Sequence, residues 1–258
     1  MKYVIVLTDG AADYPVPSLG NRTPLEAAKT PHMDELAEHG ECGLVKTVPD
    51  SVKPGSDTAN LSVMGYDPTK CYTGRSPLEA VSMGIHLADD DVAMRCNLVT
   101  LSDTERFEDA VMVDYSAGEI TTEEAAELIA AVANEIHTED IHLYPGVSYR
   151  HCLVLSHADT GTECTPPHDI TGRLVADYLP TGRYGEQLLS MMKRSREILR
   201  DHPVNAGRRL RGLNAATSCW FGRGQTSVPA AFPGAIWALR HGYFCGGLIK
   251  GIGLCAGF

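Results

Sequence analysis

Near the amino terminus, two short apolar runs flank a helical pattern. Residues 3–8 (YVIVLT) are β-branched and apolar, which is typical of a strand buried on both faces of a parallel sheet. Residues 43–48 (GLVKTV) predict a second strand. Between them, residues 23–26 (TPLE) match a capping box with proline at the first helical position, and Gly40 is placed to end the helical stretch. The order strand, helix, strand predicts an α/β sheet.

The middle of the chain has a different pattern. Residues 92–101 (VAMRCNLVTL) alternate, so a strand there would put Arg95 and Asn97 on one face and apolar side chains on the other. We interpret the whole as an α/β core, residues 1–72 and 211–258, interrupted by an inserted smaller α+β domain, residues 73–210. The other expected segments are a helix capped by residues 121–124, strands at 149–157 and 216–221, a loop at 161–172, and helices at about 183–201 and 231–242.

Charge narrows the range of partners. The 258 residues include 22 Lys and Arg against 33 Asp and Glu, a formal net charge of −11, which repels phosphate backbones and anionic lipid. We therefore expect no nucleic-acid and no membrane partner, and an anionic substrate would need a local arginine cluster or a metal. Seven Lys or Arg residues fall within 193–211, where a solvated helix face explains the run better than a nucleic-acid patch.

Cysteine usage and the lack of long apolar runs bear on the compartment. The eight cysteines form no C-x-x-C pair, which argues against a zinc ribbon. No run approaches the roughly 18 apolar residues of a membrane span, and the N-terminal run is too short for a signal peptide. These features predict a reduced, cytoplasmic protein.

Two residues stand where chemistry is expected. Asp9 ends the first expected strand in TDG, which would bring its carboxylate to the sheet edge where α/β enzymes bind ligands; capping of the next turn is the alternative. Ser56, in PGSDTANLSVMGYDP (54–68), follows a Pro-Gly turn at an expected helix N-terminus, which stabilises anions; an N-cap serine is the alternative. No G-x-S-x-G elbow is present, so a metal could activate the Ser56 hydroxyl in place of a histidine base.

Seven sequence blocks follow one another over most of the chain. They are TDG, PGSDTANLSVMGYDP (54–68), YTGRSPLEA (72–80), RCNLVT (95–100), VDYSAGEI (113–120), YPGVSYRH (144–151) and PPHDITG (166–172). Together they resemble the archaeal-type 2,3-bisphosphoglycerate-independent phosphoglycerate mutases, a branch of the alkaline phosphatase superfamily. The resemblance implies an alkaline-phosphatase-like α/β core with an inserted domain. It also implies interconversion of 3-phosphoglycerate and 2-phosphoglycerate, in glycolysis and gluconeogenesis, at a dinuclear metal site.

The resemblance further implies roles for particular residues. Ser56 would accept the phosphoryl group as phosphoserine, and Asp9 with the Ser56 oxygen would help to ligate one of two divalent ions. These ions are commonly Mn²⁺, with Mg²⁺, Co²⁺ or Zn²⁺ as alternatives, and 2,3-bisphosphoglycerate is not required. The substrate cradle would be formed by Arg95, Asn97, Arg150 and His151. Arginine suits this task because its fork binds carboxylate or phosphate through two hydrogen bonds; a surface ion pair is the alternative for each arginine, and packing or solvation for the histidine.

The chain departs from the family pattern at its carboxyl end. The family's remaining metal ligands lie beyond a Lys-Gly-x-Gly stretch, which residues 248–258 (LIKGIGLCAGF) resemble, and after His168 only His202 and His241 remain. We therefore expect the front of a longer enzyme, whose open sheet edge and apolar face favour a homo-oligomer or aggregation. The alternatives are a metal-dependent phosphomonoesterase of the same superfamily, an inactive truncated chain, and a subunit completed by another chain.

Overall fold

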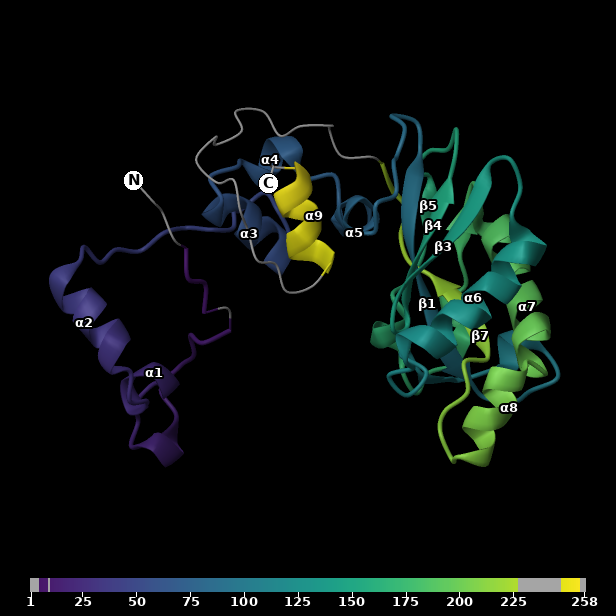
Figure 1. Cartoon of the computed structure of the whole chain (residues 1–258), viewed down its shortest axis with the longest axis horizontal. Coiled ribbons are helices and arrows are strands. Elements are labelled where there is room, and N and C mark those ends of the chain that lie inside the picture. The colour runs from purple at the N-terminus through teal and green to yellow at the C-terminus, as the bar shows by residue number, and fades with distance from the viewer. Residues whose placement is uncertain (1–4, 9, 227–246, 256–258) are drawn as a thin grey trace.

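An antiparallel sheet with helices packed on it forms one side of the structure, at the right of Figure 1; this computed structural model describes residues 5–8, 10–226 and 247–255. The long strand β1 (Val92–Leu101) pairs with β4 along one edge and with β7 and β8 along the other. The other strands of this sheet are β2 (Met112–Asp114), β3 (Ile141–Val147), β4 (Arg150–Leu155), β7 (Ser218–Phe221) and β8 (Gln225–Thr226). A separate pair joins β5 (Thr162–Glu163) to β6 (Thr181–Gly182).

Different helices cover the two faces of the sheet. On one face α6 (Thr122–Ile136) and α7 (Gly185–Arg200) enclose the main hydrophobic core, which takes Cys96 and Leu98 of β1 (Figure 1). On the other face α5 (Arg75–Ser82) contacts β1 and β4. Because alternate residues of a strand point to opposite faces, Arg95 and Asn97 lie on the α5 side, as the sequence predicts.

A smaller hydrophobic cluster lies beside α5. It buries Leu61, Leu78 and Ile252, and α9 crosses α5 so closely that a side chain at Gly251 would collide with the backbone carbonyl of Leu78. Glycine at this position is therefore a packing requirement. The helices of the cluster are α3 (Ser56–Val63), α4 (Pro68–Cys71) and α9 (Gly247–Cys255).

Short helices complete the described chain, and they follow the expected signals. Thr23 and Glu26 form the predicted capping box, and the helical stretch ends at Gly40. The predicted strands at 92–101, 149–157 and 216–221 and the helices at 121–136 and 183–201 are also confirmed. The remaining helices are α1 (Pro24–Ala27), α2 (Pro31–His39), α8 (Pro203–Leu210) and the 3₁₀ turns Pro17–Leu19, Phe107–Asp109, Pro167–Ile170 and Val175–Tyr178.

The two strands expected near the amino terminus are wrong in the part that the structure describes. Residues 5–8 and 43–48 form no strand, and their apolar side chains are exposed, with Val6 81% and Val45 81% accessible. A strand is held by ladder hydrogen bonds to a neighbour, and no described segment pairs with either run. The apolar pattern alone therefore did not determine the local structure.

The basic run at 193–211 matches the expected solvated helix face only in part. Its exposed members are Arg194, Arg200, Arg209 and Arg211, whereas Arg196 and Arg208 are buried, with 8% and 2% of their surface exposed. The reason is geometric: α7 lies against the sheet and α8 against α6, so a basic side chain on the inward side of either helix is covered.

Some expectations stay predictions. The helix at 231–242 lies outside the described residues. The division into a core and an insertion at 73–210 also stays a prediction, although β7 and β8 join the same sheet as β1. Within residues 5–8, 10–226 and 247–255, no helix is both long enough and apolar enough to cross a membrane.

Candidate functional site

Ser56 begins α3 with its hydroxyl free for chemistry. A side chain at Gly55 would collide with the Asp57 carboxylate, so the turn before the helix needs glycine. Gly55 is the N-cap, which makes the alternative of an N-cap serine wrong. Ser56 is exposed, and no described residue hydrogen-bonds to its hydroxyl. An accessible hydroxyl beside the N–H groups of a helix's first turn suits attack on an anionic phosphorus centre.

The first turn of α3 is tied to the segment that leads into α5. Asp57 is buried; its Oδ1 accepts the N–H of Thr58 at 3.0 Å and its Oδ2 accepts the hydroxyl of Tyr72. Burial raises the pKa of Tyr72, and the hydrogen bond to Asp57 raises it further, so the phenol stays a protonated donor. This pair fixes the residue next to Ser56.

A bridging carboxylate holds two arginines between α5 and β1. Glu79 accepts from Arg75 Nε at 2.9 Å and from Arg95 Nε at 3.2 Å, and it also forms an ion pair with Arg95 Nη2. Arg95 is only 24% exposed at its side chain. The ion pair that was the alternative prediction for Arg95 is thus present. It is partly buried, and it orients the Arg95 guanidinium on the α5 face of the sheet.

Next to this ion pair is a cavity of about 660 Å³ between α5, β1, the end of β3, the start of β4 and α9. Arg150 reaches it with an exposed guanidinium that lies 4.9 Å from the centre of the Tyr149 ring. Three cations against one carboxylate give the cavity a local positive charge in a chain of net charge −11. The charged residues of its lining are Glu79, Arg95, Arg150 and Lys250.

Lys250 is the cavity residue that sequence reasoning missed. It comes from α9, about 150 residues away from β1 in the chain, and it is exposed. The Lys-Gly-x-Gly stretch was noticed in the sequence, yet only the contact between α9 and α5 places its lysine opposite Arg95 and Arg150.

His151 lies at the wall of the same cavity as a buried, neutral ring. It is 3% exposed, its Nδ1 accepts the N–H of Gly146 at 3.0 Å, and burial lowers the pKa of His151 to about 3. Because Nδ1 accepts, the ring proton belongs on Nε2, which has no partner among the described residues. His151 therefore has an unpartnered, buried Nε2 donor beside the cavity, and it carries no charge near neutral pH.

Asn97 lies close to these residues without lining the cavity. It sits opposite Arg150 in the β1–β4 register, is 3% exposed, and donates from Nδ2 to the Tyr115 carbonyl at 3.2 Å. Its role in binding stays a prediction. His168 and Asp169 form an exposed pair in the 3₁₀ turn Pro167–Ile170, with 3.4 Å between the His168 Nε2 and the Asp169 Oδ1.

The described residues do not fit a dinuclear metal centre. No group of three or more His, Cys, Asp or Glu side chains lies together anywhere in the part of the chain with a described placement. Asp9 lies outside the described residues, so its expected role as a ligand is untested. Ser56 does not line the cavity. It begins α3, and α9 contacts both α3 and α5, a helix that lines the cavity.

Comparison with known proteins decides the family. A model of the 2,3-bisphosphoglycerate-independent phosphoglycerate mutases matches residues 37–205, more than half of the chain. The chain belongs to this family. A mutase of that name from Methanosarcina mazei is 49% identical over the whole chain, and a probable one from Geobacter sulfurreducens is 46% identical. The chain spans 64% of the length of each of these two relatives.

Solved structures agree with this assignment. A Pyrococcus horikoshii protein superposes with a TM-score of 0.71 at 28% identity, covering 97% of this chain and 58% of its own. The cofactor-independent phosphoglycerate mutase of Thermoplasma acidophilum gives a TM-score of 0.52 at 30% identity, covering 86% of this chain and 59% of its own. The mixed helix-and-sheet architecture is therefore that of the phosphoglycerate mutase family.

Proposed function

We propose that this chain binds phosphoglycerate in the cavity of Arg95, Arg150 and Lys250 and takes part in the interconversion of 3-phosphoglycerate and 2-phosphoglycerate. The observation that carries the proposal is the cluster of three cations on one cavity of an acidic chain that belongs to the mutase family. Such a cluster overcomes the repulsion between the net charge of −11 and a substrate that carries both phosphate and carboxylate.

The cavity residues would divide the work of binding. Arg150 and Lys250 have no carboxylate partner within the described chain, so their full charge is available to the substrate. Arg95 is already held by Glu79 and is suited to orienting a group through its remaining nitrogen. His151 would add a neutral Nε2 donor, which suits a hydroxyl or carboxylate oxygen.

Ser56 would be the phosphoryl acceptor. Its Oγ would form a bond to phosphorus as the bond between phosphorus and the glycerate O3 breaks, and the serine proton would end on O3. In the reverse transfer O2 would take the phosphoryl group, and the O2 proton would return to Ser56 Oγ. Retransfer requires that glycerate stay bound while its phosphoryl group is on the serine. Cations that hold the carboxylate of glycerate meet this need, whereas a phosphomonoesterase does not need to retain its dephosphorylated product.

A dinuclear site, with Mn²⁺ as the expected ion, belongs to the same proposal, but it would need ligands beyond those that the described residues provide. Of the expected ligands, only Ser56 lies within the described residues, so no step is assigned to a metal here. Cytoplasmic location and a homo-oligomeric state likewise stay predictions.

Binding of 3-phosphoglycerate, measured by isothermal titration calorimetry, tests the proposal. Loss of one charge-assisted contact of about 1.5–3 kcal/mol should raise the Kd of Arg150→Met roughly 10- to 150-fold. Arg183→Met is the matched control, because Arg183 is also exposed and lies over a neighbouring tyrosine ring, at 5.6 Å, but outside the cavity. Equal affinities of Arg150→Met and wild type would overturn the assignment of the cavity.

A further inference from the structure

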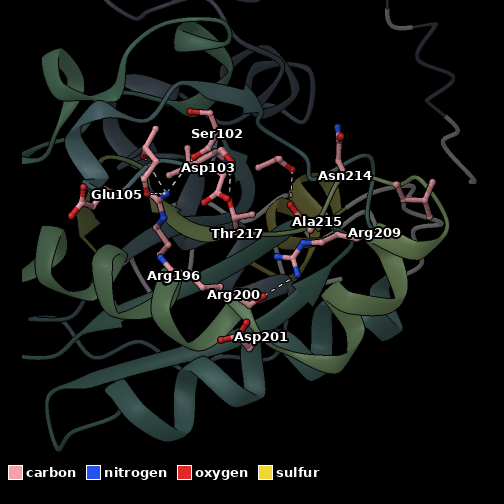
Figure 2. Close-up of a pocket in the computed structure, with 14 residues that line it drawn as sticks. Ser102, Asp103, Glu105, Arg196, Arg200, Asp201, Arg209, Asn214, Ala215 and Thr217 are labelled. Atoms are coloured by element: carbon pink, nitrogen blue, oxygen red, sulfur yellow. Dashed lines mark hydrogen bonds between the residues drawn. The ribbon is translucent and has the colours of Figure 1, made fainter.

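A second cavity, of about 760 Å³, is shown in Figure 2. It lies at the opposite end of β1 from the cavity of Arg95, Arg150 and Lys250, which is called the phosphoglycerate cavity below. It is enclosed by the loop after β1, the end of α7, α8 and residues 213–217, and it shares no lining residue with the first. Three arginines line it: Arg196 and Arg200 from α7, and Arg209 from α8. It is large enough for a small metabolite.

Arg196 is a buried charge without a counter-ion. With 8% of its surface exposed, it donates from Nη2 to the Thr104 carbonyl at 2.8 Å and to the Ser102 carbonyl at 3.3 Å, both uncharged acceptors. Its Nη1 is buried and has no partner among the described residues. Burying a guanidinium in this way is costly unless an anion compensates it.

Another buried arginine in the same region does have a carboxylate as its counter-ion. Arg208, 2% exposed, has the Glu124 carboxylate as its ion-pair partner. Arg196 has none within 4.0 Å in the described chain, and neither do Arg200 and Arg209. Arg209 donates only to the Arg200 carbonyl, at 2.9 Å.

Arg196 and Arg200 repel each other. Burial lowers the pKa of Arg196, the charge of Arg200 lowers it further, and the charge of Asp103 offsets this only in part. Asp103, Glu105 and Asp201 also line the cavity, but they are exposed and none lies within ion-pair distance of these arginines. Because these acids balance the charge of the cavity as a whole, an extended polyanion such as nucleic acid gains nothing there. A small anion that contacts the guanidinium groups directly would still be attracted.

We propose that this cavity is a second anion site, which takes a small organic phosphate or carboxylate on Arg196, Arg200 and Arg209. The ligand meets Arg200 and Arg209 first, since both are exposed. It reaches the shielded Nη1 of Arg196 by displacing the loop of residues 102–105, which Arg196 holds only through uncharged oxygen atoms. The inference does not depend on the mutase activity.

Nuclear magnetic resonance of the full ¹⁵N-labelled chain tests the site directly. Inorganic phosphate and citrate are titrated separately at constant ionic strength, and the amide shifts of residues 102–105 are followed. Saturable shifts with inorganic phosphate indicate that the ligand's anionic group is a phosphate. Saturable shifts with citrate indicate that it is a carboxylate. No saturable shift with either probe overturns the proposal.

Variants separate this site from the phosphoglycerate cavity. Arg200→Gln should weaken binding at least about fivefold, because it removes one charged donor without breaking any bond within the described chain. Arg194→Gln, on the same helix but outside the cavity, is the control and should bind as wild type does. Arg150→Met should leave the shifts at 102–105 unchanged, so a failure of the mutase proposal does not affect the result. Equal affinity of Arg200→Gln and wild type would contradict the site.

Discussion

Replacing Arg208 with methionine removes a guanidinium that connects three segments of the sheet region. Its Nε donates to the Asn214 carbonyl at 2.8 Å, its Nη2 donates to the Ala117 carbonyl at 2.6 Å, and its Nη1 pairs with Glu124. Breaking a buried pair costs about 3–5 kcal/mol. We expect the lower end, about 3 kcal/mol or roughly 6–12 °C in Tm, because Glu124 is 20% exposed and keeps its second partner, Arg211.

Arg211→Met is the matched control for this prediction. Arg211 pairs with the same Glu124 carboxylate, but its side chain is 56% exposed against 2% for Arg208. Exposed pairs contribute about 0.2–1 kcal/mol, so the two variants should differ clearly in urea unfolding followed by circular dichroism. Equal losses of stability would refute the reasoning that burial, rather than pairing alone, sets the contribution.

Two other predictions concern stability. His151 has a pKa of about 3 when folded, against an ordinary value of 6.5, so the unfolded chain binds the proton first and stability falls as pH drops below about 6.5. At pH 5 the loss of unfolding free energy should be about 2 kcal/mol. His151→Gln should remove this dependence on pH when the urea midpoints are compared at pH 7 and pH 5. An unchanged dependence would contradict a neutral buried ring. Gly251→Ala should cost about 1–3 kcal/mol through its collision with α5. Gly207→Ala, in α8 with no atom within 4 Å of the new methyl group, should instead gain about 0.5–1 kcal/mol, and thermal unfolding that gave both changes the same sign would refute this contrast.

Local signals predicted much of the fold. The alternation of residues 92–101 identified β1 and the face that carries Arg95, and the capping signal at Thr121 identified the start of α6. Both signals are contained in a few consecutive residues, so they need no knowledge of distant segments. The strand predictions failed at the described residues 5–8 and at 43–48, because a strand depends on a neighbour that the apolar run itself does not specify.

The candidate site was only partly predictable for the same reason. Motif resemblance picked Arg95, Arg150 and His151, which the structure brings to one cavity. Lys250 was missed because its place depends on how α9 crosses α5, a contact between distant segments. The burial of Arg196 was missed because a run of basic residues does not reveal which side chain faces inward.

An enolase-coupled mutase assay on the purified chain with Mn²⁺, run beside Ser56→Ala, tests the central claim most directly. The account predicts that the wild-type chain binds 3-phosphoglycerate and that any turnover it gives is lost in Ser56→Ala, with circular dichroism showing that both are folded. It also predicts that Ser56→Ala binds 3-phosphoglycerate as well as wild type does, since Ser56 does not line the binding cavity. A folded wild-type chain that does not bind 3-phosphoglycerate, or a Ser56→Ala variant that still turns it over, would contradict it.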